Sequence, residues 1–198
     1  MAYSIEPISA NCYPGTSILI NKFDIRDEAT LNEVEGTLTA AKSAQWLNMP
    51  ERNTFDFEHY KAIHQFLFSD LYAWAGQIRD VNISKKGTAF CPAEMINEQA
   101  NKIFSYLKGQ NFLCGLTKSS FVDGLVDFYC STNMPHPFRE GNGRTQRVFL
   151  SQLAQNAGYM LNFAEIDGDL LMIATIQSAQ GVTDLLRSIL NTAIEFQE

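Results

Sequence analysis

The stretch HPFREGNGRTQR, from His136 to Arg147, holds an unusual density of chemistry-bearing side chains. It contains one imidazole, one carboxylate, two glycines that flank an asparagine, and three arginines. The residues that follow it are typical of an amphipathic helix, so the stretch is expected to be a loop that opens a helix. A loop of this composition at a helix start indicates a binding or catalytic site.

The centre of the stretch predicts an anion site. Gly141, Asn142 and Gly143 immediately precede the helical run that starts at Arg144. Glycines let backbone N–H groups turn toward one point, and a helix N-terminus adds unpaired donors and the positive end of the helix dipole. Arg144 and Arg147 are three residues apart and share one face of that helix, which suits more than one phosphate group.

Two further residues add reactive groups beside this anion site. A carboxylate next to a polyphosphate repels it unless a cation lies between them, and Mg²⁺ is the usual cation, so Glu140 is the candidate metal ligand. A neutral imidazole takes a proton from a hydroxyl near pH 7, so His136 is the candidate general base. Each residue alone has an ordinary structural explanation, but their conjunction in one loop favours transfer of a group at phosphorus.

The rest of the chain is predicted to be mostly helical, which makes the expected fold class all-α. Apolar residues recur at steps of three and four, as they do on one face of a helix. The predicted helices cover residues 27–47, 56–74, 93–108, 118–132, 144–156, 165–176 and 182–196. One segment, RDVNISKKGTAFCP at 79–92, instead alternates on both sides of a Lys-Gly pair and predicts a short β-hairpin that folds over the motif as a flap.

Composition narrows the class of protein. A chain of 198 residues fits one domain, and its net charge of -7 argues against broad binding of nucleic acid or of a membrane surface. No apolar run approaches the roughly 20 residues of a membrane-spanning helix, and no signal peptide is expected. The cysteines form no C-x-x-C pair, so we expect free thiols and a cytoplasmic protein; they are Cys12, Cys91, Cys114 and Cys130.

The stretch resembles the signature of the Fic family, H-P-F-x-[D/E]-G-N-G-R-x-x-R, at every fixed position. The segment IHQFLFSDLYAWAGQIR, from Ile63 to Arg79, is similar to the helix that leads into the flap of that family. CYPGT, followed by LINKFDI, is similar to the N-terminus of its compact, toxin-like members. The resemblance covers nearly the whole chain and implies one Fic domain over 1–198, a helical core with a β-hairpin flap over the active site.

The resemblance also implies an activity, that of a protein adenylyltransferase. Such an enzyme moves AMP from ATP, its co-substrate, to a Ser, Thr or Tyr hydroxyl of a target protein and releases pyrophosphate. By position, His136 is the implied base and Glu140 the Mg²⁺ ligand. The implied nucleotide-binding residues are Gly141, Asn142 and Gly143 at the α-phosphate, Arg144 and Arg147 at the β- and γ-phosphates, and Gln177 near the adenine.

The flap is implied to hold the target by adding it as a further strand. Its residues are Ile83, Ser84, Lys85, Lys86, Gly87, Thr88, Ala89 and Phe90. Gly143 stands where the kinase-like branch of the family has Lys, which favours nucleotide transfer over phosphorylation. The alternatives are transfer of UMP, phosphocholine or phosphate on the same fold, or a nucleotide-binding partner protein with little turnover.

Many Fic proteins carry an inhibitory helix, [S/T]-x-x-x-E-[G/N], whose Glu pairs with the second arginine of the motif. The nearest match here is TLNEVEGT, in which Glu35-Gly36 is present but position 31 is Leu. We therefore expect 27–47 to be a core helix, and inhibition to come in trans from a small antitoxin whose Glu reaches Arg147. The expected target is a protein, with type II topoisomerase subunits as a plausible class, and no direct nucleic-acid or membrane partner is expected.

Overall fold

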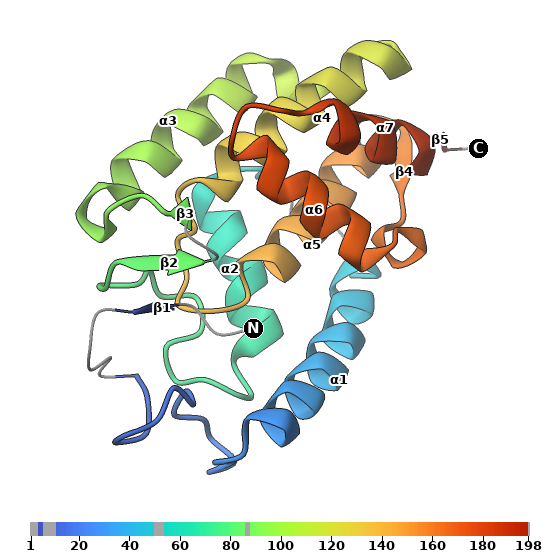
Figure 1. Ribbon diagram of the computed structural model, residues 1–198. Coiled ribbons are helices and arrows are strands. Elements are labelled where there is room, and N and C mark those ends of the chain that lie inside the picture. The colour runs from blue at the N-terminus through green and yellow to red at the C-terminus, as the bar shows by residue number, and fades with distance from the viewer. Residues whose placement is uncertain (1–3, 6–10, 50–53, 86–87, 198) are drawn as a thin grey trace.

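The computed structural model describes residues 4–5, 11–49, 54–85 and 88–197, and in these ranges the chain is predominantly helical (Figure 1). The all-α expectation is confirmed. The α-helices are α1 (Glu28–Leu47), α2 (Phe57–Phe68), α3 (Ile96–Gly109), α4 (Lys118–Asn133), α5 (Asn142–Asn156), α6 (Gly168–Ser178) and α7 (Asp184–Ala193). Short 3₁₀ turns are η1 (Ala93–Met95), η2 (Asn111–Leu113) and η3 (Phe163–Glu165).

Helix α5 lies at the centre of the bundle and packs against α1, α2 and α4 (Figure 1). Most of the surface of α5 is buried, because apolar residues occur on several of its faces; they include Val148, Phe149 and Leu153. Its buried polar side chains are paired: the Gln146 amide donates to the Tyr129 carbonyl and the Thr132 hydroxyl, both at 2.8 Å. Since α5 starts at the predicted anion site, a helix packed on several sides positions that site.

The core beside α5 is aromatic. The ring of Phe149 lies 5.5 Å from the ring centroids of Tyr60, Phe104 and Phe128, and edge-on or tilted contacts predominate. Such pairs favour this geometry because the positive ring edge meets the negative face of the next ring. They tie α2, α3 and α4 to the helix that carries the motif.

The flap is a small antiparallel sheet at the edge of the bundle. Strands β2 (Ile83–Lys85) and β3 (Thr88–Ala89) form the predicted hairpin, with Ser84 opposite Ala89. A third strand, β1 (Ser4–Ile5), pairs with the other edge of β2 and was not predicted. The hairpin is therefore confirmed, but its first strand, β2, is the middle strand of a sheet in the order β1-β2-β3.

Two predicted helices were too long. The helix predicted over 56–74 ends at Phe68, because the chain then turns back and buries Leu71 and Tyr72 against the bundle, with the Tyr72 ring stacked on Trp74 at 4.4 Å. The helix predicted over 182–196 ends at Ala193. Its last residues form β5 (Ile194–Phe196), which pairs with β4 (Tyr159–Leu161).

Strand β5 forms in place of the last turn of the predicted helix because β4 is available to pair with it. Tyr159 follows Gly158, whose φ of +84° ends α5, and its ring stacks on Phe121 at 4.4 Å. Ile194 is fully buried opposite Leu161. Period alone could not distinguish these short segments from a continued helix, because each spans only three residues. In the ranges that the structure describes, no helix combines the length and the apolar character needed to cross a membrane.

Candidate active site

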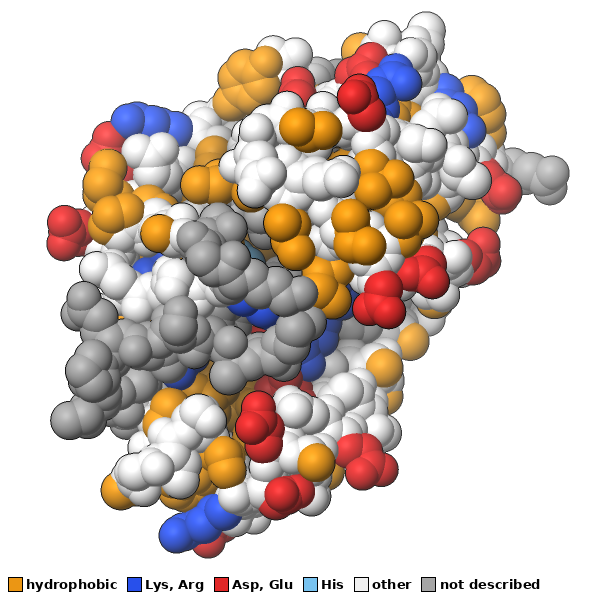
Figure 2. Space-filling model, viewed as in Figure 1, with side chains coloured by type: hydrophobic (Ala, Val, Ile, Leu, Met, Phe, Trp, Pro, Cys, Tyr) orange, Lys and Arg blue, Asp and Glu red, His pale blue; other side chains and the backbone are white. Residues whose placement is uncertain are grey.

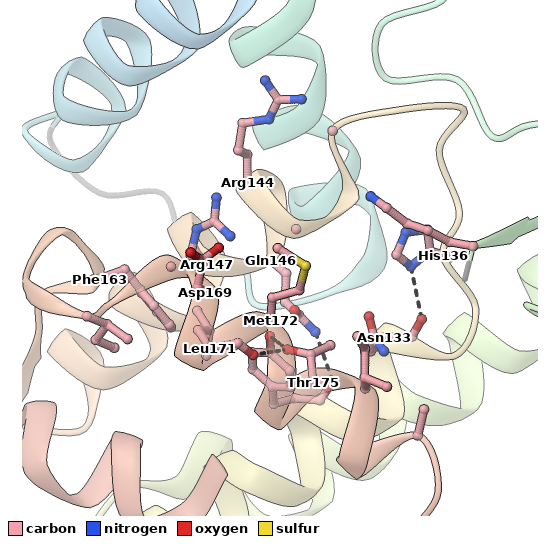
Figure 3. Close-up of a pocket in the computed structure, with 18 of the residues that line it drawn as sticks. Asn133, His136, Arg144, Gln146, Arg147, Phe163, Asp169, Leu171, Met172 and Thr175 are labelled. Carbon is pink, nitrogen blue, oxygen red and sulfur yellow. Dashed lines mark hydrogen bonds between the residues drawn. The ribbon is translucent and has the colours of Figure 1, made fainter. Parts of the chain in front are cut away.

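A cavity of about 620 Å³ opens where the N-terminus of α5, the end of α4, the flap and α6 meet. Figure 2 shows Lys and Arg side chains deep in this hollow and apolar side chains gathered over the neighbouring α6. In Figure 3, His136 and Asn133 lie on one side of the cavity, with Arg147, Asp169 and Phe163 on the other. The predicted base, metal ligand and second arginine therefore line one cavity of a size that suits a nucleotide.

His136 has a constrained backbone and a defined tautomer. Its φ is +42°, in the left-handed region that a histidine seldom adopts, which turns its ring toward the cavity. Its Nδ1 lies 3.1 Å from the Asn133 carbonyl oxygen (Figure 3). A carbonyl oxygen only accepts, so Nδ1 carries the proton of the neutral ring and Nε2 carries the basic lone pair.

The surroundings keep His136 neutral. Burial lowers its pKa to about 3, the hydrogen bond to Asn133 opposes that shift, and the cations of Lys85 and Arg79 add to it. The ring of Phe90, at the end of the flap, stacks on the imidazole with centroids 3.8 Å apart and planes within 12°. The flap therefore covers the candidate base on its outer side, and near pH 7 the imidazole is a proton acceptor.

The two glycines of the motif are required for different reasons. Gly141 has φ +80° and caps α5, and a Cβ there would lie 2.2 Å from the Phe68 ring, so only glycine fits. Gly143 lies within the first turn of α5, where a Cβ would meet only the Arg147 guanidinium at 3.5 Å, an ordinary contact. The fold therefore does not demand glycine at 143, and its missing side chain leaves room at the helix N-terminus.

The side chain of Asn142 stabilises the loop. Its Oδ1 accepts the Phe138 N–H at 2.8 Å, and its Nδ2 donates to the Phe138 carbonyl at 2.7 Å. Asn142 is buried, and Phe138 is fully buried. The amide of Asn142 is thus committed to the loop, and only its backbone N–H, in the first turn of α5, is oriented to contribute to an anion hole.

A second buried histidine also holds the loop. The Gly76 N–H donates to His64 Nδ1 at 2.8 Å, so Nδ1 is unprotonated and Nε2 donates to the Glu140 carbonyl oxygen at 3.0 Å. The ring stacks on Phe138 at 3.8 Å, and burial lowers its pKa to about 3. A charged imidazole would lose the Gly76 bond, so His64 supports the motif as a neutral group.

The two predicted phosphate-binding arginines differ in their surroundings. Arg147 lines the cavity, and no ion pair of its guanidinium occurs within the described ranges. Arg144 points toward α1 (Figure 3), where its Nη2 lies 2.5 Å from Glu35 Oε1 and its guanidinium lies over the Phe68 ring. Phosphate binding by Arg147 stays a prediction, whereas Arg144 already has a counter-charge because the buried Glu35 requires one.

Glu35 therefore contacts the first arginine of the motif and not the second. It is buried, and its other carboxylate oxygen accepts a hydrogen bond from the Tyr72 hydroxyl. Helix α1, which carries it, packs against α2 and α5 as a core element. This geometry agrees with the expectation of a structural helix and gives no support to an inhibitory Glu35 that occupies Arg147.

Glu140 lies where a metal ligand is expected. Its Oε1 accepts the Gly141 N–H at 2.9 Å and lies 3.4 Å from Arg144 Nη2, and the residue lines the cavity. No three His, Cys, Asp or Glu side chains of the described ranges converge on one point. A cation held here would take one carboxylate from Glu140 and its remaining ligands from phosphate and water, a donor set that suits Mg²⁺.

The predicted flap residues lie partly at the cavity. Lys85 and Phe90 line it, Ile83 is buried beneath the sheet, and Ser84, Thr88 and Ala89 belong to the strands. Lys86 and Gly87 lie outside the described residues. The outer edge of β2 is already paired with Ser4–Ile5, so a target strand would have to use the edge of β3 or displace β1.

One face of α6 lines the cavity and was missed as part of the site. Its residues recur at helical spacing: Gly168, Asp169, Leu171, Met172, Thr175, Ile176 and Ala179. The periodicity of 165–176 could have identified this face, but nothing local indicates that it faces the motif. Gln177 is not among the lining residues; its carbonyl accepts N–H groups from Gln180 and Val182, and its contact with adenine stays a prediction.

Comparison with known proteins agrees with the motif and the fold. The Fic/DOC family model matches residues 54–154. The chain is 39% identical over 171 residues to "Probable protein adenylyltransferase y4lH" of Sinorhizobium fredii, covering 86% of this chain and 88% of that protein. It is 34% identical over 182 residues to "Probable protein adenylyltransferase Fic" of Escherichia coli, covering 92% and 90%.

A solved structure extends the likeness to three dimensions. The BepC protein of Bartonella tribocorum, crystallised with bound AMPPNP, matches with a TM-score of 0.90 at 26% identity, over 95% of this chain and 97% of that one. The match spans the helices that surround the cavity, since it covers nearly the whole of both chains. With its motif intact at the start of its central helix, the chain belongs to the Fic/DOC family.

Proposed function

We propose that the protein is a protein adenylyltransferase that moves AMP from ATP to a hydroxyl of a target protein. Membership in the family and the names of its relatives make it a nucleotidyltransferase. The observation that carries the proposal is His136, whose Nδ1–H bond to Asn133 leaves a basic Nε2 in a cavity that Arg147 also lines. Binding of ATP alone needs no such base.

In the proposed reaction, Nε2 of His136 takes the proton of the target hydroxyl while its oxygen attacks the α-phosphorus of ATP. The bond from the α-phosphorus to the bridging oxygen breaks, and pyrophosphate leaves. The first-turn N–H groups of α5 stabilise charge on the α-phosphate, and Arg147 stabilises charge on the outer phosphates. Positioning supplies most of the rate, and the proton transfer adds roughly 10²- to 10⁴-fold.

Glu140 is the proposed ligand of Mg²⁺, which when bound neutralises charge on the phosphates. The flap is the proposed docking site of the target, with Lys85 and Phe90 next to the base. An open edge of β3 offers backbone groups to an extended segment, which is how a strand adds to a sheet. The proposed adenine end of the cavity is the face of α6 that carries Met172 and Thr175.

A second cavity supports inhibition in trans. It has a volume of about 470 Å³, lies between α1 and α5, and shares Arg144 and Arg147 with the first cavity. Apart from Leu47 at its end, its α1 wall consists of small residues, which let a helix approach closely: Gly36, Thr39, Ala40, Ser43 and Ala44. We propose that an antitoxin lays a helix in this groove and directs a carboxylate at Arg147, which would make the protein the toxin of a pair.

The proposed compartment is the cytoplasm. All four cysteines are free thiols, as expected in a reducing environment that also supplies ATP. Type II topoisomerase subunits remain the proposed target class. The labelling experiment below identifies the target protein directly.

The decisive experiment incubates the purified protein with Mg²⁺, ATP and a bacterial lysate, and compares α-labelled with γ-labelled ATP. The matched variant is His136→Ala, with ATP binding measured in both proteins by calorimetry. We expect α-label, and no γ-label, on a discrete lysate protein with the unaltered chain. The variant should bind ATP and transfer at least about 10²-fold more slowly.

Each other result has a defined meaning. Transfer of γ-label would indicate phosphorylation, and label from UTP in place of ATP would indicate uridylylation. ATP binding without transfer under any donor would contradict the proposal and favour a nucleotide-binding partner protein. The labelled protein, identified by mass spectrometry, tests the topoisomerase assignment independently of the activity.

A further inference from the structure

Arg79 is a buried cation that the proposed chemistry does not use. It follows α2 and precedes the flap, and only 4% of it is exposed. It does not line the cavity. Its side chain lies behind the motif. It donates to backbone carbonyl oxygens of the motif loop on one side and of the flap on the other.

On the motif side, Arg79 contacts three consecutive residues. Its Nε donates to the His136 carbonyl at 2.8 Å, and its Nη2 donates to the Pro135 carbonyl at 3.1 Å. Its backbone N–H donates to the Pro137 carbonyl at 2.9 Å. These are the carbonyls around the residue whose φ is +42°, a conformation that persists only where its surroundings determine it.

On the flap side, Arg79 contacts both ends of the hairpin. Nη1 donates to the Val81 carbonyl at 2.6 Å, just before β2, and Nη2 donates to the Cys91 carbonyl at 2.5 Å, just after β3. The Cys91 N–H in turn donates to the Met134 carbonyl at 3.1 Å. One planar guanidinium thus joins the two strands of the flap to the loop that carries the base.

We propose that Arg79 is a positioning residue that fixes the distance between the flap and His136, and so places the target hydroxyl on the base. The inference rests on the proposed function, in which the flap holds the target. A rigid fork of donors can satisfy four carbonyls in fixed directions, whereas the single ammonium of a lysine cannot. Nucleotide binding, which uses the other side of the motif, does not depend on this clamp.

The test compares Arg79→Lys and Arg79→Gln with the unaltered protein. The matched control is Arg187→Lys, a partly exposed arginine paired with Asp123 at 2.6 Å, away from the cavity. For each protein, ATP affinity, kcat for AMP transfer and KM for the target are measured. We expect both Arg79 variants to bind ATP normally and to lose transfer by roughly 10²-fold, the effect of a misplacement near 1 Å, while the control keeps its rate.

The pH dependence of the transfer rate distinguishes the positioning role of Arg79 from the effect of its charge on His136. The Arg79 cation, like that of Lys85, lowers the pKa of His136, so its removal in Arg79→Gln should move the acidic limb of the rate profile to higher pH. Arg79→Lys keeps a cation, so the acidic limb of its rate profile should remain at the same pH while its kcat falls. A lysine variant that transfers AMP at the normal rate would overturn the proposal, since a charge alone would then suffice.

Further outcomes also test the positioning role of Arg79. Loss of ATP affinity in parallel with kcat in both variants would overturn positioning in favour of a general structural role. If neither variant folds, hydrogen exchange of the unaltered protein answers instead: the amides of Arg79 and Cys91 should be strongly protected, and rapid exchange of both would overturn the clamp. Absence of transfer by the unaltered protein would refute the proposed function and not Arg79, which keeps the two failures distinct.

Discussion

At the scale of single residues, the motif contains candidate reactive residues and residues that hold the loop in place, and only the structure separates the two. Gly141 is glycine because φ is +80° and Phe68 fills the space of a side chain, whereas Gly143 is open. Asn142 is committed to Phe138, and His64, seventy-two residues before His136, holds the loop from behind. The reactive groups of the motif are therefore few, and the remaining residues keep the loop in place.

This difference predicts opposite outcomes for two alanine variants. Gly143→Ala should fold with unchanged or slightly higher stability, because alanine gains up to about 1 kcal/mol over glycine inside a helix, while ATP affinity falls as the methyl group meets the phosphates. Gly141→Ala should lose about 2–4 kcal/mol from strain and overlap with Phe68. Thermal melts and calorimetry with ATP check both.

Gly109→Ala is the control for helix propensity alone. Gly109 lies at the end of α3, and no atom lies within 4 Å of the Cβ that alanine would add. Normal ATP affinity in Gly143→Ala would contradict the placement of phosphates at the start of α5. A Gly141→Ala variant as stable as the unaltered protein would show that Phe68 moves aside without cost.

At the scale of elements, α1 and α5 are joined by an ion pair between the buried Glu35 and the partly buried Arg144, whose function the sequence left open. Glu35 contacts Arg144 and Tyr72, with Thr39 3.4 Å from the same guanidinium. Arg147 is not part of this network, so α1 holds the first arginine without engaging the one that is proposed to bind phosphate. The cavity beside it, between α1 and α5, is the proposed docking site of an antitoxin helix.

Glu35→Gln should therefore destabilise the protein without activating it. Loss of a buried partner of Arg144 is expected to cost about 2 kcal/mol, since one charge then remains poorly compensated. The exposed pair Glu98–Lys102 offers the control Glu98→Gln, which should cost little. Denaturant unfolding and AMP transfer are the measurements; a faster transfer by Glu35→Gln would instead identify Glu35 as an inhibitor in cis.

At the scale of the whole molecule, all three histidines are buried, and burial lowers the pKa of each. His59 is surrounded by the rings of Trp46, Phe55 and Phe149. A group whose pKa is lower in the folded chain binds a proton more readily when unfolded. Its contribution to stability is complete above the unfolded value near 6.5 and is lost as the pH falls below it.

The free energy of unfolding should therefore decline below pH 6.5, with a slope that approaches about 2.7 kcal/mol per pH unit from His64 and His136 and is increased further by His59. Chemical unfolding at pH 7.5, 6.5 and 5.5 measures it. Carboxylates contribute little in that window, because their unfolded pKa values lie near 4. His59→Phe should make the slope shallower, and constant stability from pH 7.5 to 5.5 would show that the folded histidines accept protons.

Much of this molecule follows from local patterns. The spacing of apolar residues located five of the helices with ends shifted by at most three residues, and the Lys-Gly pair located the hairpin. Local patterns mispredicted the ends of two helices, where tertiary packing sets the boundary. Helix α2 ends at Phe68, so that Leu71 and Tyr72 are buried, and the residues after α7 form a strand because β4 is available to pair with them.

The sequence by itself determined the family, the order of the reactive groups and the presence of a flap, because each is encoded in residues close together along the chain. Only the tertiary structure decided that Arg144 is engaged by Glu35, that α6 completes the cavity, and that Arg79 joins the flap to His136. The physical reason is that a buried charge takes its partners from whichever segments pack against it, and those segments lie far apart in sequence.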